Sequence, residues 1–158
     1  MSFKIDHTVD VQAPADVVWE VLTDFARYGE WNPFVVECQT ALKPGAPIEM
    51  AVALKNKPQH VVEVIREVSP GRGFSYSMKP VPGGALSSLR SHAIEPAGAG
   101  RSRYISHFEL RGWLRHLVLA LFRKNLEEGF AGMAAAIKRR AEQLQAQRQG
   151  KPARAAAH

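Results

Sequence analysis

One 22-residue stretch near the N-terminus, residues 13–34, most restricts the folds that this chain can adopt. Pro14 suits the first turn of a helix, because its φ is fixed and its missing N–H would have no partner there. The next apolar residues recur at helical spacing: Val17, Val18, Val21 and Leu22. Asp24 is placed to cap a second helix over residues 25–30, which Trp31-Asn32-Pro33 ends. The stretch therefore predicts two consecutive short helices.

Extended segments lie on both sides of these helices. Residues 3–12 alternate apolar and polar side chains, which predicts a half-buried strand. After the helices, turns rich in Pro, Gly and Asn separate six further segments: residues 34–41, 47–55, 59–68, 73–79, 86–95 and 101–111. Because short turns join these strands, we expect them to pair antiparallel.

From Trp113 onward the apolar period becomes helical. The stripe consists of Phe122, Leu126, Phe130, Met133, Ile137, Ala141 and Leu144, spaced three or four apart. It predicts one helix of about nine turns. Gly129 and Gly132 lie inside it, where each costs roughly 1 kcal/mol relative to Ala. Either a close strand, a kink or a ligand exploits them, or they are a tolerated weakness.

The order of one strand, two short helices, six strands and one long helix resembles the START-like (SRPBCC) superfamily, which includes the birch-pollen-allergen-type proteins. Trp19, Asp24, Tyr28 and Trp31-Asn32-Pro33 carry the resemblance at the N-terminus. Weaker similarities to its polyketide cyclase/dehydrase-like branch follow at residues 68–72, 92–96 and 107–112, and the whole resemblance spans about residues 3–145. One departure is Phe74-Ser75-Tyr76, where relatives often carry a Trp.

The resemblance implies an α+β helix-grip fold, in which a curved antiparallel sheet of about seven strands wraps around a long C-terminal helix and an apolar cavity. We expect one such domain over residues 1–147. Residues 148–158 are expected to form a disordered basic tail.

Charge and cysteine content narrow the range of partners. Of the formal charge of +6, residues 138–158 hold six basic residues and one acidic residue, so the rest of the chain is nearly neutral. This pattern indicates a solvated helix end and no nucleic-acid partner. Cys38 is the only cysteine, which excludes an internal disulfide and fits a reducing cytoplasm. Residues 113–122 are too short to span a bilayer, so only peripheral membrane contact stays open.

The chain has no motif for a nucleotide cofactor and no clustered metal ligands, so we expect neither a cofactor nor a metal. His92 is the one weak catalytic candidate, since a cavity-facing His could move protons at a carbonyl. His107 is expected to point outward, opposite the apolar face of its strand. Cys38 is interpreted as a small buried hydrophobe.

In a hollow fold, inward apolar side chains also line the cavity. We expect the ligand to contact Val36, Met50, Val52, Phe74, Tyr76, Met78, Arg90, His92, Tyr104, Phe108, Phe122, Leu126, Phe130 and Met133. Asn125 joins Tyr76, Arg90, His92 and Tyr104 as a candidate polar contact.

These observations favour a protein that binds a small, largely apolar molecule of the lipid, polyketide or aromatic type. Two alternatives remain. The first is a cofactor-independent cyclase or dehydratase using acid–base residues in the cavity. The second is a lipid or quinone chaperone, for which the apolar and basic stretch 113–124 would contact a membrane. The sequence leaves the oligomeric state open.

Overall fold

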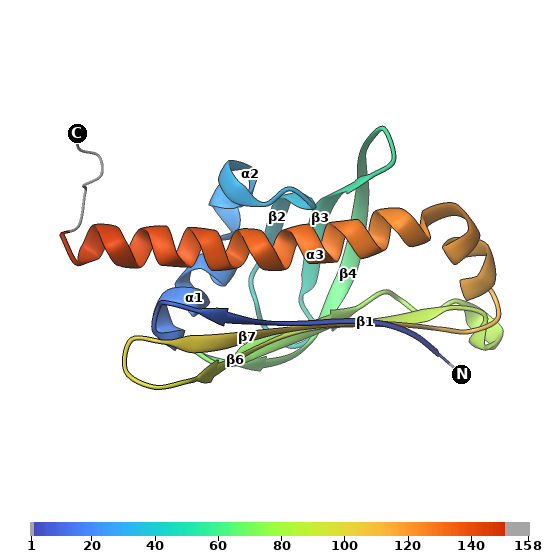
Figure 1. Ribbon diagram of the computed structural model, residues 1–158. Helices are drawn as coiled ribbons and strands as arrows, with labels where there is room; N and C mark the ends of the chain where they lie inside the picture. The colour runs from blue at the N-terminus through green and yellow to red at the C-terminus, as the bar shows by residue number, and fades with distance from the viewer. Residues whose placement is uncertain (1, 151–158) are drawn as a thin grey trace.

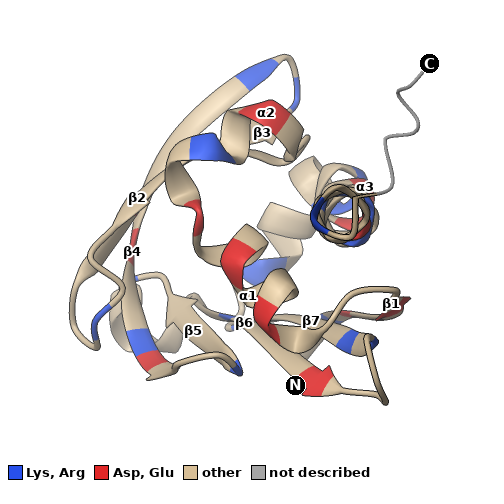
Figure 2. Ribbon diagram, turned by 90° about the vertical axis from the view of Figure 1, so that its left-hand side faces the viewer, with Lys and Arg blue, Asp and Glu red and all other residues tan. Residues whose placement is uncertain are grey.

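Seven antiparallel strands form a single sheet that curves around the C-terminal helix (Figures 1 and 2). The computed structural model describes residues 2–150. The strands are β1 (Ser2–Val11), β2 (Val35–Thr40), β3 (Pro47–Leu54), β4 (Lys57–Ser69), β5 (Gly73–Ser77), β6 (Ser87–Pro96) and β7 (Ser102–Arg111), in the spatial order β1-β7-β6-β5-β4-β3-β2. The predicted helix-grip fold is thereby confirmed.

The two short helices between β1 and β2 fill one end of the sheet. Helix α1 (Ala15–Thr23) starts after Pro14 and buries the predicted apolar stripe. The second predicted helix is divided into a 3₁₀ turn, η1 (Phe25–Arg27), and a short helix, α2 (Tyr28–Trp31). The expectation that Asp24 caps it is wrong, because the Asp24 side chain makes no capping hydrogen bond and pairs instead with Arg27 at 3.3 Å.

Asn32 fixes the chain where α2 ends. Its side chain is buried, and Oδ1 accepts hydrogen bonds from the backbone N–H groups of Phe34 and Val35, both at 2.9 Å. This local turn sets the direction in which β2 begins. It thereby places Phe34 and Val35, both buried, beneath the long helix.

The long helix α3 (Arg115–Arg148) has 34 residues and crosses the open face of the sheet (Figure 1). Seen nearly end-on in Figure 2, it lies in the hollow of the sheet, with β2 and β4 on one side and β7 and β1 below. Its buried residues follow the predicted stripe from Leu126 through Phe130, Met133 and Ile137 to Ala141.

Strand β4 is longer than its sequence pattern predicted and includes Pro58. Proline lacks the N–H that a central strand needs. It is tolerated because the pairing of β4 with β5 begins only at Val64, so the start of β4 has a neighbour on the β3 side alone.

At the other end of the chain, the expected tail of residues 148–158 begins at the last residue of α3, and residues 151–158 lie outside the described part.

Candidate functional site

A cavity of about 190 Å³ lies between the concave face of the sheet and the first half of α3. All of its lining residues are apolar or aromatic except Glu63, Ser88 and Arg90. Nine of the 17 lining residues are half-buried, among them Leu54, Leu86 and Val118 near the start of α3, whereas Arg90 is buried. The cavity therefore reaches the surface and is closed at Arg90.

Strand alternation explains much of this lining. Of the predicted contacts, the cavity is lined by Met50, Val52, Tyr76, Met78, Arg90, Phe108, Leu126 and Phe130. Tyr76, Arg90 and Phe108 face one another directly across β5, β6 and β7. One row of residues from three strands therefore faces the helix residue Phe130.

Six predicted contacts lie elsewhere: Val36, Phe74, His92, Tyr104, Phe122 and Met133. A register shift between Val35 and Glu37 turns Val35 into the cavity in place of Val36. Phe122 lies under the Lys55 ammonium, 5.3 Å from the ring centroid to Nζ. Asn125 is half-buried on α3 and does not line the cavity either.

His92 points inward but lies behind the cavity. Its ring is buried, and its Nδ1 lies 2.6 Å from the Tyr104 hydroxyl. Ring centroids of Phe74 and Tyr76 lie 4.9 and 6.2 Å from that of His92. Burial, and secondarily the charge of Arg90, holds the pKa of His92 well below its usual range. His92 is therefore a neutral core residue, shielded from the cavity by aromatic neighbours. His107, as expected, faces outward, where it pairs with Asp6.

Several lining residues escaped prediction: Phe34, Val35, Leu54, Val61, Glu63, Leu86, Ser88, Leu110 and Val118. Period-two alternation along β4 could have found Val61 and Glu63, which share a face with the buried Ile65. Leu110 shares its face with Phe108 in the same way. Leu86 and Ser88 alternate with Arg90 along the predicted strand 86–95, so the same period could have found them.

Arg90 is the one cation that lines the cavity. Only 3% of it is exposed, and its guanidinium carbon lies 4.6 Å from the centroid of the Phe130 ring. Nη1 donates hydrogen bonds to the Ser106 hydroxyl at 2.6 Å and to the His107 carbonyl at 3.3 Å. The charge is therefore held by β7 and by the face of an aromatic ring.

Glu63 is the one carboxyl group in the lining. Burial raises its pKa from 4.5 to about 7, while the charge of Arg90 acts in the opposite direction. At neutral pH the protonated and ionised forms of Glu63 are therefore both populated. A group of this kind can donate or accept a proton near a bound molecule.

The sequence model for "Polyketide cyclase / dehydrase and lipid transport" matches residues 2–142. The chain belongs to this family. Its fold is similar to that of the Zhui aromatase/cyclase from Streptomyces sp. R1128, with a TM-score of 0.70 and 19% identity over 90% of this chain and 94% of that one. For a START superfamily protein from Mycobacterium smegmatis the TM-score is 0.67, with 18% sequence identity over 89% of this chain and 98% of that one. For truncated norcoclaurine synthase from Thalictrum flavum the TM-score is 0.62, with 18% sequence identity over 87% of this chain and 92% of that one. No curated protein sequence matches this chain.

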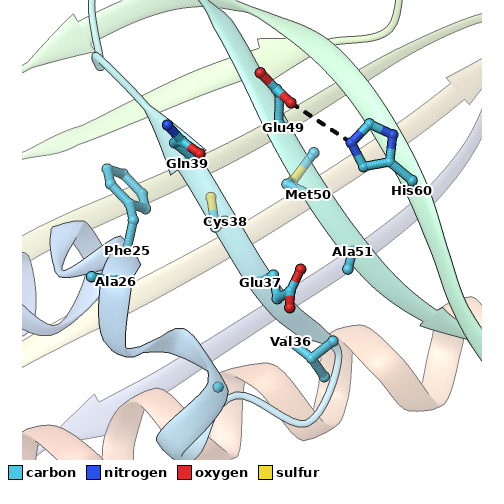
Figure 3. Close-up of a pocket in the computed structure, with 11 residues that line it drawn as sticks. Phe25, Ala26, Val36, Glu37, Cys38, Gln39, Glu49, Met50, Ala51 and His60 are labelled. Carbon is cyan, nitrogen blue, oxygen red and sulfur yellow. Dashed lines mark ion pairs between the residues drawn. The ribbon is translucent and has the colours of Figure 1, made fainter.

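This member of the polyketide cyclase/dehydrase family also has a groove of about 490 Å³ on its surface, between η1, α2 and the β2–β3 hairpin (Figure 3). Its polar lining residues Glu37, Gln39, Glu49 and His60 are all exposed, and His60 pairs with Glu49 at 3.7 Å. Burial raises the pKa of the Cys38 thiol to about 12, so the thiol is not reactive. The groove has no converging buried polar group, which distinguishes it from the inner cavity.

Over residues 2–150, no cluster of His, Cys, Asp and Glu side chains could hold a metal ion. Within the same range, no helix is both long and apolar enough to cross a membrane.

Proposed function

We propose that this protein binds a small, largely apolar molecule in the cavity between the sheet and α3. The observation that supports this most directly is an apolar cavity, open at one end, that holds a buried cation and a carboxyl group. Apolar cavities of about 150 Å³ can bind benzene. A cavity of about 190 Å³ therefore suits one ring with short substituents, or a short acyl chain.

Two neighbouring residues of β4 allow a matched test. Val61 lines the cavity, whereas Val62 points outward and is 44% exposed. Val61→Trp should fill the cavity and weaken binding of the neutral probe propylbenzene at least tenfold, measured by ligand-observed NMR. Val62→Trp should bind like the wild type, and circular dichroism checks that both variants fold. Equal binding by the two variants would contradict the proposal.

Acid–base catalysis is a second candidate function, favoured by Glu63 lining the same cavity as Arg90. In this function Glu63, rather than His92, would exchange a proton with a bound ketone, since His92 is screened from the cavity. The test is turnover of a short synthetic poly-β-ketone, followed by absorbance. Glu63→Gln should abolish turnover if the protein is such an enzyme, and an unchanged rate would exclude Glu63 from that role.

Exchange of a lipid or quinone with a membrane is a third candidate, favoured by an exposed apolar stripe beside the cavity opening. Trp113, Leu117 and Leu121 are 66%, 58% and 50% exposed and lie four residues apart, Trp113 just before α3 and the other two in its first turns. The nearby basic residues Arg123 and Lys124 suit anionic head groups.

The single Cys38 is unpaired, which is consistent with a cytoplasmic location.

Sedimentation with phosphatidylserine-containing vesicles tests this third candidate. Leu117→Glu should abolish co-sedimentation. Leu89→Glu, at an exposed apolar position on β6, is the control and should leave it unchanged. Equal sedimentation of the two variants would argue against a docking role for the stripe.

A further inference from the structure

The buried guanidinium of Arg90 uses only part of its hydrogen-bonding capacity. An arginine presents five N–H donors. Nη1 has two oxygen partners within 3.3 Å, and the Ser91 carbonyl lies at 3.5 Å. Among residues 2–150, the only hydrogen-bond partner of Nη2 is the Met133 sulfur, at 3.7 Å. Nε has no hydrogen-bond partner among residues 2–150.

The two poorly satisfied nitrogens lie on the same edge of the guanidinium. Nε–H and one N–H of Nη2 point in parallel, and this fork matches the two oxygens of a carboxylate. A buried cation is normally paired, because leaving it unpaired in an apolar interior is costly. Within the described residues Arg90 forms no ion pair, and Glu63, which shares the cavity, is not within 4.0 Å of it.

We propose that the ligand of this cavity carries a carboxylate, which binds the Nε–Nη2 edge of Arg90 while its apolar part lies against Phe108, Leu126 and Phe130. This inference rests on the proposed binding function and narrows its ligand class. The ligand carboxylate replaces the Met133 thioether at Nη2, because a thioether sulfur is a weak acceptor. Met133 does not line the cavity, so its unbranched side chain has to shift to open this edge of the guanidinium to the ligand.

Arg90 thus acts as a specificity-determining residue at the closed end of the cavity. The apolar part of the ligand points toward Leu54 and Val118 at the opening. A neutral molecule of the same shape fits the cavity but leaves the guanidinium edge unpaired. Selection between acid and neutral analogues is therefore the measurable consequence.

The experiment compares 4-ethylbenzoate with 4-ethylbenzamide, which has nearly the same shape but no charge, by isothermal titration calorimetry. The wild type should bind the benzoate at least tenfold more tightly. Arg90→Met removes the fork but keeps an unbranched apolar side chain, and it should bind both molecules equally. Arg90→Lys keeps the charge without the fork and should retain only part of the preference. Arg101→Met, in the exposed β6–β7 turn, removes the same charge outside the cavity and should retain the full preference.

The outcomes separate this inference from the function on which it rests. If the wild type binds neither molecule and also fails to bind propylbenzene, the proposed function is wrong. If it binds both analogues equally, or if Arg90→Met keeps the preference, the carboxylate inference is wrong while the binding function stands. Circular dichroism of Arg90→Met and its binding of propylbenzene show whether the cavity has survived the substitution.

Discussion

Gly129 and Gly132, one turn apart in α3, should respond in opposite ways to substitution by alanine. Both substitutions add the same helix propensity, about 1 kcal/mol. A Cβ at Gly132 would lie 3.5 Å from Pro33 Cγ, an ordinary contact. A Cβ at Gly129 would lie 2.3 Å from Cδ1 and Cε1 of Phe34, well inside the favourable separation of about 3.5–4.0 Å.

The Phe34 ring has little freedom to move away from such a Cβ. It is 3% exposed, and its centroid lies 4.9 Å from that of Phe130 in an edge-to-face contact. Its backbone N–H is held by Asn32. Overpacking of a tight core costs about 1–3 kcal/mol. Since this site is at the severe end of that range, Gly129→Ala should lower the free energy of unfolding by about 2 kcal/mol after the propensity gain.

Gly132→Ala should instead raise the free energy of unfolding by about 1 kcal/mol. Urea denaturation followed by circular dichroism measures both values. Phe34→Leu combined with Gly129→Ala should lose less stability than the sum of the single changes, because the smaller side chain relieves the overlap. If Gly129→Ala is as stable as Gly132→Ala, the close approach of α3 to Phe34 is not what requires glycine at that position.

Three further predictions concern other parts of the fold. Folding raises the pKa of Glu63 from 4.5 to about 7, so the folded state binds more protons and the free energy of unfolding falls as the pH rises from 4.5 to 7. In urea denaturation, Glu63→Gln should therefore be as stable as the wild type at pH 4.5 and more stable at pH 8. A variant with the same pH profile as the wild type would contradict this. Trp19, half-buried with its ring 6.3 Å from that of Phe74, is a structural anchor, so Trp19→Ala should cost about 2 kcal/mol, and a loss below about 0.5 kcal/mol would show that it is not. Gly73→Ala would place a Cβ 2.1 Å from the His92 carbonyl oxygen and should cost at least about 2 kcal/mol by thermal denaturation, whereas wild-type stability would mean that β5 and β6 are not so closely paired.

The element order was predictable because each element has a strong local signal. Alternation marks β1, and the three-and-four spacing from Phe122 to Leu144 marks α3. The 3₁₀ turn at Phe25–Arg27 was missed, since a capped helix and a tight turn begin with the same residue types. The extension of β4 through Pro58 was missed as well, because it depends on where β5 ends, which is a tertiary fact.

The expected ligand contacts coincide only in part with the residues that line the cavity. Phe108 and Tyr76 follow from alternation within uninterrupted pairing. Val36 does not, because the register shift in β2 exchanges it with Val35. Periodicity identifies the inner face of a strand but not how deep a residue lies along it. For this reason Phe74 and His92 face inward yet lie behind the cavity.

Glu63 was missed because an acidic residue on an inward face contradicts the pattern used to find that face. The same contradiction makes it informative, since no charged group in the described chain pairs with it, and burial alone raises its pKa. Residues that break an otherwise consistent pattern are more often found at functional sites. Arg90 on β6 breaks the apolar pattern of an inward face in the same way, between the inward residues Ser88 and His92.

The polar groups of the cavity come from the sheet alone. Glu63, Ser88 and Arg90 lie on β4 and β6, whereas α3 contributes Val118, Leu126 and Phe130. A helix that packs along a sheet needs a continuous apolar stripe, so a polar residue there would weaken its attachment. An inward strand position can carry a polar side chain where that side chain has a partner, as Arg90 does on the face of the Phe130 ring. In the proposed complex, single inward residues of the strands would set chemical selectivity, while α3 would close the cavity over the apolar part of the ligand.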